Sequence, residues 1–204
     1  IAKGYTADAC RDLAVSMGAR GVLVSVGTSS VSVSGTRADG SPWRVGLRDP
    51  HGAPTSVAGV VELPAGGMAS LSTSGDNLGP LGRLRAACAG PAAERATVPA
   101  AVHVAGSLAE PVLGRARETL RETAAGGSRI FDHHIIDPRW GYPARSGVRQ
   151  VSVVASSGVL AEALSTALLV DPSIDVSDVV ARWSRATGTP ASAKVVGLVR
   201  AGSG

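Results

Sequence analysis

Hydrophobic and polar residues alternate along the first part of the chain in the way that β-strands produce. "GVLVSVG" is a short apolar run that predicts a buried strand, and "SVSVSG" alternates with a period of two. "WRVGLRD" and the two halves of "SVAGVVELPAGGMASLSTSG", which a Pro-Ala-Gly-Gly turn separates, predict further strands. Before them, "TADACRDLAVSMGARG" predicts an amphipathic helix with Leu13 and Met17 on one face and a stop at Gly18 or Gly21. We therefore expect an antiparallel meander packed on one helix.

The last part of the chain mixes strand and helix patterns. "VRQVSVVA" predicts a strand, and "SSGVLAEALSTALLV" predicts a helix that begins after a serine cap. "DVSDVVARWSRATG" predicts a second amphipathic helix, with Val179, Val180 and Trp183 facing inward and Gly188 at its end. "AKVVGLVR" predicts a final strand. The pattern favours an α+β fold with antiparallel sheets and packed helices.

Residues 77–130 differ from their flanks because they are rich in alanine and low in complexity. "EPVLGRARETLRET" in this stretch predicts a helix, with Pro111 near its first turn. We interpret 77–130 as an insertion in a single domain that spans residues 1–204. Two roles stay open for it: a solvated insertion, or a lid or partner-docking arm.

Composition narrows the class of protein. The chain has 204 residues, 44% of them hydrophobic and 3% aromatic, so it can form a globular core built mainly of aliphatic side chains. No apolar run approaches the roughly 18 residues that a membrane-spanning helix needs. The net charge is +4, and the charged residues are spread thinly rather than gathered in a basic stripe. We therefore expect no nucleic-acid partner.

Glu162 and Thr166 form the first candidate site. They lie four residues apart on a predicted helix, so their side chains point the same way, and Ser165 lies beside them. A carboxylate with a hydroxyl one turn further on is a plausible site for a hard cation, because oxygen ligands favour Mg²⁺ or Ca²⁺. The alternative is that Glu162 lies in solvent and Thr166 bonds to its own helix backbone.

The stretch "FDHHIIDPRWGYP" holds the second candidate site. His133 and His134 are adjacent, and in extended chain they point to opposite sides, so at most one of them serves a given pocket. Asp137 and the prolines that follow stiffen the loop and can hold a histidine in a fixed position. Metal binding, acid–base catalysis and simple packing all stay open for the pair. A third candidate, "STSG" at the end of a predicted strand, fits either a plain turn or a close approach to a phosphate or a ring.

Several of these motifs together resemble one protein family. In order along the chain they are "IAKGYTAD", "VSVGTSSVSVSG", "PWRVGLRDP", "LSTSGD", "HHIIDPRWGYPA" and "VSVVASSGVLAEALSTALLV". This order is similar to that of the ApbE family, the FAD:protein FMN transferases, over residues 1–76 and 131–200. The resemblance implies an α+β, T-fold-like domain, and it implies that the family's N-terminal part is missing from this chain.

The resemblance also implies a chemistry. Family members bind FAD and Mg²⁺, split the pyrophosphate of FAD, and attach FMN through its phosphate to a Ser or Thr hydroxyl of a target flavoprotein. By position, Lys3 and Ile136 match residues that contact the flavin nucleotide, and His134 matches the acid–base histidine. Glu162 and Thr166 match the magnesium ligands, with Ser165 at a neighbouring position that can also face the metal. His133 is then expected to point away from the site.

The chain departs from the family pattern at a few positions. Glu162 stands in place of an Asp, Asn77 in place of an aromatic residue, and Trp140 in place of a Thr. Two alternatives to the transferase are therefore kept: a flavin-binding protein without transfer activity, and an FAD pyrophosphatase that releases FMN and AMP. The resemblance further implies a bacterial protein at the outer face of the cytoplasmic membrane, anchored by a lipid on a missing N-terminal segment.

Overall fold

The computed structural model describes residues 1–50, 55–75 and 134–200, all of which belong to one compact unit. The predicted insertion 77–130 and His133 lie outside these residues. The helices are α1 (Ala2–Ser16), α4 (Gly158–Val170) and α5 (Val176–Thr187). The strands are β1 (Gly21–Val26), β2 (Ser30–Gly35), β3 (Arg44–Arg48), β4 (Val57–Glu62), β5 (Met68–Gly75), β6 (Ile136–Asp137), β7 (Tyr142–Pro143), β8 (Val148–Ala155) and β9 (Ala193–Arg200).

The main sheet contains five of these strands in the order β1-β2-β5-β8-β9, and each neighbouring pair is antiparallel. β3 and β4 pair with each other in a separate sheet, as do β6 and β7. The α+β prediction with antiparallel sheets and packed helices is therefore confirmed. The predicted meander is wrong, because β2 pairs with β5 rather than with β3. The β3–β4 hairpin leaves the sheet between these two strands.

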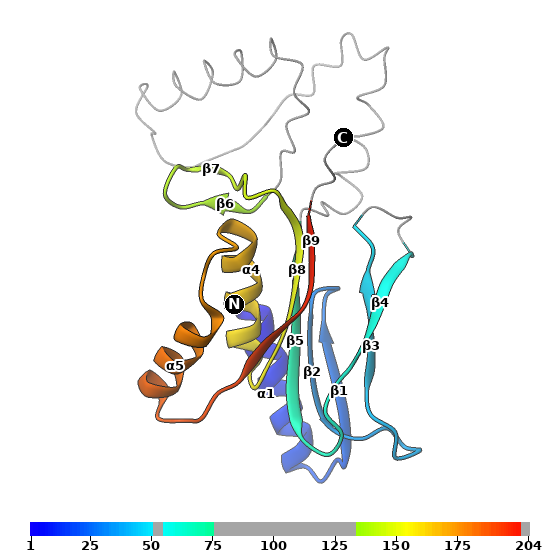
Figure 1. The fold of residues 1–204 in the computed structure, drawn as a ribbon. Coiled ribbons are helices and arrows are strands. Elements are labelled where there is room, and N and C mark those ends of the chain that lie inside the picture. The colour runs from blue at the N-terminus through cyan, green and yellow to red at the C-terminus, as the bar shows by residue number, and fades with distance from the viewer. Residues whose placement is uncertain (51–54, 76–133, 201–204) are drawn as a thin grey trace, which may run out of the picture. The chain divides into compact units, whose positions relative to one another are not determined.

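The main sheet is covered on both faces, with the helices on one side and the β3–β4 hairpin on the other (Figure 1). α1 lies over β1 and β2, and α4 lies over β5 and β8. On the hairpin side, Val33 and Leu71 of the sheet pack against Leu47 and Leu63. The alternation in "SVSVSG" thus does not separate core from solvent. It sends the valines toward the hairpin, while Ser30 and Ser32 are buried on the helix side.

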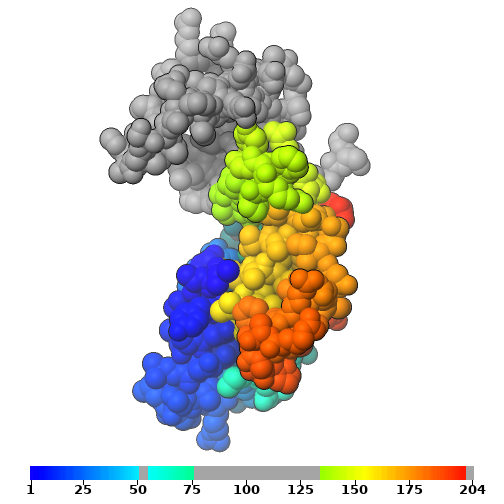
Figure 2. Space-filling model, turned by 90° about the vertical axis from the view of Figure 1, so that its left-hand side faces the viewer, coloured from blue at the N-terminus to red at the C-terminus, as the bar shows by residue number. Residues whose placement is uncertain are grey.

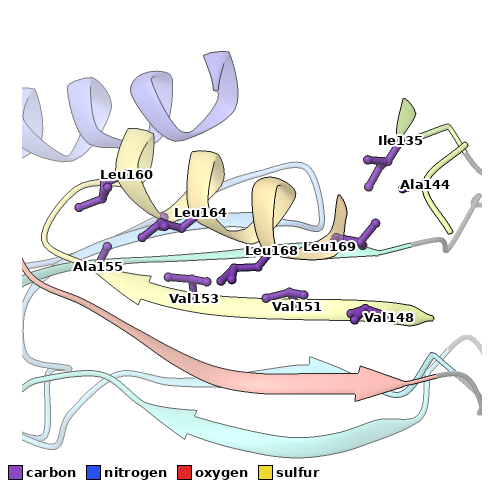
Figure 3. Packing of buried hydrophobic residues seen from close by; sticks show 11 residues of the cluster. Ile135, Ala144, Val148, Val151, Val153, Ala155, Leu160, Leu164, Leu168 and Leu169 are labelled. Carbon is purple, nitrogen blue, oxygen red and sulfur yellow. The ribbon is translucent and has the colours of Figure 1, made fainter. Parts of the chain in front are cut away.

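The larger hydrophobic cluster lies between α4 and β8, where leucines of the helix meet valines of the strand (Figure 3). Leu160, Leu164 and Leu168 recur every fourth residue, so one face of α4 presents them together to the strand. α5 adds Val179, Val180 and Trp183 at the margin of this cluster, as its periodicity predicted. No helix among the described residues is both long and apolar enough to cross a bilayer.

The predicted serine cap of α4 and the predicted glycine at the end of α5 are confirmed. The Ser157 hydroxyl accepts a hydrogen bond from the Leu160 amide at 3.2 Å and caps α4. The Asp175 carboxylate accepts hydrogen bonds from the first amides of α5. Gly188 ends that helix in the left-handed conformation at φ 67°, which favours glycine.

The predicted inward face of α1 is wrong. Leu13 and Met17 are 61% and 79% exposed, while the buried residues of the helix are Gly4, Ala7 and Arg11. A glycine and an alanine allow the backbones to come close, and the Arg11 guanidinium is buried because Asp8 and Asp12 neutralise it. Likewise, β1 is not fully buried as its apolar run predicted, since it lies at an edge of the sheet with alternate residues exposed.

Candidate active site

A pocket of about 540 Å³ opens where the starts of α1 and β8 meet the end of β5. Seven segments line it: Lys3 at the start of α1, Thr28 and Ser29 in the β1–β2 turn, Arg48 at the end of β3, 72–75 in β5, 134–136, Gln150 of β8, and Glu162 and Thr166 of α4. Of the residues that the sequence singled out, Lys3, His134, Ile136, Glu162 and Thr166 line this one pocket. Ser165 lies just behind it.

Glu162 is the acidic residue among the described residues that line the pocket. It is 6% exposed, so the alternative that it lies in solvent is wrong. Its Oε2 accepts a hydrogen bond from the Gly4 amide at 2.8 Å and lies 3.0 Å from the backbone nitrogen of Ile1. Its Oε1 lies 3.9 Å from the Lys3 ammonium. Burial alone raises the pKa of Glu162, but the hydrogen bond from the Gly4 amide and nearby positive charge, that of Lys3 included, hold that pKa below its ordinary value.

Lys3 reaches the pocket from the first turn of α1. Its Nζ donates a hydrogen bond to the Ser29 hydroxyl, and its side chain is half exposed. It therefore brings a positive charge to the wall of the pocket between the β1–β2 turn and Glu162. An ammonium at such a place suits an anionic group such as a phosphate.

The hydroxyl of Thr166 does not bond to its own helix backbone. It lies 2.9 Å from the Ser74 hydroxyl, which also lies 2.9 Å from the Ser165 hydroxyl. Ser165 donates to Ser72 at 3.2 Å and is fully buried. The hydroxyls of α4 and β5 thus form a connected row that ends in the pocket at Thr166. This row fixes the helix against the strand by directed bonds rather than by apolar contact.

The loop that carries His134 is held by an ion pair between Asp137 and Arg139. The Asp137 carboxylate accepts hydrogen bonds from the backbone amide of Arg139 at 2.9 Å and from its guanidinium, which also reaches Asp171. Arg139 holds the pKa of Asp137 below its ordinary value. Gly141 closes the turn at φ 73°, a conformation that favours glycine. The stiff loop expected from "DPRWGYP" is therefore present, and it carries His134 and Ile136 at the pocket.

Several pocket residues were not singled out individually from the sequence. Ser29 and Arg48 come from a turn and from a strand end that looked ordinary, and Gln150 lies in a stretch that was predicted simply as a strand. Gln150 donates to the Arg48 carbonyl at 2.9 Å and so joins β8 to β3. The "STSG" stretch did give a signal, because Ser72, Ser74 and Gly75 all line the pocket. No group of three or more His, Cys, Asp or Glu side chains within 1–50, 55–75 and 134–200 could hold a metal ion by itself.

The fold is similar to that of several solved structures. Among solved structures, the chain is similar to the ApbE protein from Thermotoga maritima, with a TM-score of 0.55, 28% identity and coverage of 98% of this chain and 49% of that chain. It shares its fold with the flavinyl transferase ApbE of Pseudomonas stutzeri (TM-score 0.51, 24% identity, 99% and 45% covered). It also shares it with the flavin transferase ApbE from Vibrio cholerae (TM-score 0.53, 21% identity, 100% and 49% covered). The chain therefore spans about half the length of these structures.

No curated protein sequence matches the chain significantly. A family model does match it, over residues 1–79 and 116–188, which is more than half of the chain, and the unmatched residues between these ranges lie inside the predicted insertion. The matched ranges include every pocket residue. On this match, the chain belongs to the ApbE family.

Proposed function

We propose that the protein transfers FMN from FAD to a Ser or Thr hydroxyl of an acceptor flavoprotein. The observation that carries the proposal is that Lys3, His134, Ile136, Glu162 and Thr166, which match functional positions of the ApbE family, come from three separate parts of the sequence and line one pocket. Membership of the family supports the same class of reaction. Two of the solved structures with this fold are named as flavin transferases.

The side-chain oxygen atoms of Glu162 and Thr166 are of the kind that binds magnesium. Mg²⁺ is usually bound through one or two carboxylates, with water and substrate phosphates completing its shell. Glu162 supplies one carboxylate, with Oε1 on the side of Lys3 rather than of Gly4, and Thr166 supplies a hydroxyl. We propose that these two side chains would hold the ion, and that Ser165 supports Thr166 through Ser74. When bound there, the ion would neutralise charge on the phosphates.

The other pocket residues bind the substrate and move a proton. The acceptor hydroxyl oxygen attacks the phosphorus on the FMN side of the pyrophosphate, the bond to the bridging oxygen breaks, and AMP leaves. We propose that an imidazole nitrogen of His134 takes the proton of the hydroxyl, since a histidine can exchange protons near neutral pH. Lys3 would orient the anionic diphosphate, and Ile136 would contact the flavin. The stiff Asp137–Arg139 turn keeps His134 at a constant position relative to the pocket.

Incubation of the full-length protein with FAD, Mg²⁺ and a Ser/Thr acceptor peptide tests the proposal, with mass spectrometry of the peptide as readout. Covalent FMN is the expected product, and its formation should fall by about two orders of magnitude or more in His134→Ala, the usual range for loss of a general base. Arg145→Ala is the matched control, because Arg145 is exposed in the same segment and does not line the pocket. Free FMN with AMP would indicate a pyrophosphatase instead, and unchanged FAD would indicate a flavin-binding protein.

The acceptor and the place of action are proposed from the family alone. We propose a flavoprotein acceptor at the outer face of a bacterial cytoplasmic membrane. Fractionation of cells that express the full-length protein, with protease accessibility of intact spheroplasts, tests this location. Recovery from the cytosol would contradict it.

A further inference from the structure

The starts of α1 and α4 touch through their backbones at two glycines. A Cβ atom on Gly4 would lie 2.2 Å from the Gly158 carbonyl oxygen, and one on Gly158 would lie 2.5 Å from the Gly4 carbonyl oxygen. Any larger residue at either position would push the helices apart. Figure 2 shows the two helices side by side, α1 in blue and α4 in yellow.

Each of these helix starts is capped by a carboxylate from the other helix. The Gly158 amide donates to Asp8 Oδ2 at 2.6 Å, and the Gly4 amide donates to Glu162 Oε2 at 2.8 Å. The first amides of a helix have no partner within it, and a negative charge there also favours the helix dipole. Each helix thus has a first-turn amide bonded to a carboxylate of the other helix.

The spacing of glycine and carboxylate behind this exchange is the same in both helices. Residues 4–9 read "GYTADA" and residues 158–163 read "GVLAEA", so a glycine is followed four residues later by a carboxylate. Four residues are about one helical turn, which places the glycine and the carboxylate on the same face. With the glycines in contact, each carboxylate reaches the start of the opposite helix.

The two carboxylates differ in what their second oxygen does. Asp8 Oδ1 accepts from the hydroxyls of Ser32 at 2.7 Å and Ser70 at 2.8 Å, and from Arg11 at 3.1 Å. Asp8 is thus bonded on both oxygens and does not line the pocket. Glu162 lines the pocket, and its Oε1 has the Lys3 ammonium at 3.9 Å as its ionic partner among the described residues.

We infer that Asp8 is a positioning residue for Glu162 and Thr166. Asp8 joins the sheet, through Ser32 and Ser70, to the first turn of α4. It thereby fixes where the next turns of that helix point. Loss of its bond to Gly158 loosens the glycine contact, and with it the Gly4–Glu162 bond that orients the pocket carboxylate. The inference rests on the proposed function for the role of Glu162, whereas the mutual capping itself does not.

Asp8→Asn in the full chain tests the inference, with Asp12→Asn as a matched control. Both changes remove a carboxylate that contacts Arg11 on the same helix, but Asp12 is 56% exposed on its side chain and bonds to Arg11 rather than to α4. The first readout is amide hydrogen exchange at Gly158 and Gly4 by NMR. The second is the affinity for Mn²⁺, a stand-in for Mg²⁺, measured by paramagnetic resonance well below the melting temperature.

We expect faster exchange at both amides in Asp8→Asn and about tenfold weaker Mn²⁺ binding, the lower end of the range for residues that orient metal ligands. Asp12→Asn should match the wild type in both. Equal exchange in the two variants would overturn the mutual capping, and faster exchange with unchanged Mn²⁺ affinity would overturn the positioning role. A wild type that binds no Mn²⁺ would overturn the proposed metal site and the positioning role, while the exchange data still decide the capping.

If Asp8→Asn fails to fold, Ser32→Ala gives a milder form of the same test. It removes one donor to Asp8 Oδ1 and leaves the carboxylate in place. We expect the same direction of change at both amides with a smaller loss of Mn²⁺ affinity. No change in either readout would again count against the positioning role.

Discussion

The two halves of the contact between α4 and the sheet are built from different chemistry. Toward β8, the helix presents leucines to valines of the strand (Figure 3). Toward β5, the same helix presents Ser165 and Thr166 to Ser72 and Ser74, and hydroxyl pairs at 2.9 to 3.2 Å join them. The pocket opens at the second half, not at the first.

The difference separates stability from positioning. We call the contact of α4 with β8 the leucine half and its contact with β5 the serine half. Apolar contacts are non-directional, so the leucine half stabilises the fold without closely fixing the rotation of α4 about its own axis. Hydrogen bonds require particular distances and angles, so the serine half fixes where Glu162 and Thr166 point. Mutations in the two halves should therefore differ in kind as well as in size.

The largest effect should come from Gly158→Ala, at the first residue of α4, where this helix touches Gly4 of α1. The new Cβ would lie 2.5 Å from a backbone oxygen, and backbone atoms cannot rotate aside as a side chain would. We expect a loss in the free energy of unfolding above about 3 kcal/mol, the upper end of the usual cost of overpacking. Urea unfolding measures it. Gly59→Ala is the control, because a Cβ there meets nothing within 4 Å, and equal losses in the two variants would contradict the prediction.

The next largest effect is expected in the leucine half. Leu164 is 1% exposed, and Leu164→Ala removes its contacts with the valines of β8 and leaves a cavity. We expect a loss of about 3 kcal/mol, with little change in Mn²⁺ affinity at low temperature. Leu13→Ala is the control on an exposed side chain and should cost within about 0.5 kcal/mol. A weaker Mn²⁺ site in Leu164→Ala would show that the two halves are not separate.

The serine half should respond differently to single and double changes. Ser165→Ala leaves the buried Ser72 hydroxyl without its bond to α4 and should cost about 1 to 2 kcal/mol. Ser72→Ala added to it removes the unpaired hydroxyl, so we expect the double variant to be more stable than Ser165→Ala alone. Chemical unfolding of the two single variants and the double variant measures this coupling. Additive losses would mean that the two hydroxyls do not depend on each other.

The smallest effect concerns acid stability. The pKa of Glu162 is held below its ordinary value of 4.5, so the folded state favours the ionised carboxylate. This contribution is fully present above pH 4.5 and is lost as the pH falls through the folded-state pKa. In Glu162→Gln, the free energy of unfolding should fall less steeply over that acidic range. Asp39, Asp137 and Asp171 have lowered pKa values too, so part of the slope should remain. An unchanged slope would contradict the prediction.

The sequence was sufficient for most elements, and Lys3, His134, Ile136, Glu162 and Thr166, which it singled out, all line the pocket. The helices α4 and α5 could be predicted because their signals are local. A serine cap, aliphatic residues at helical spacing and a terminal glycine each act within a few residues. It failed at α1, where apolar periodicity chose Leu13 and Met17 over Gly4, Ala7 and Arg11. The reason is that the buried face of α1 carries small side chains and an arginine. The small side chains allow close contact between backbones, and the charge of the arginine is neutralised by neighbouring carboxylates.

The sequence alone therefore determined which elements and motifs the chain contains. Alternation predicted the strands, caps and helical spacing predicted the helices, and the family motifs follow one another in order. The tertiary structure decided which of them meet. Strand pairing between β2 and β5 depends on residues far apart in the chain, and so does the contact of Gly4 with Gly158. No local pattern encodes these distances. They arise because the aliphatic faces, the buried serines and the helix starts must all find partners in one packed unit.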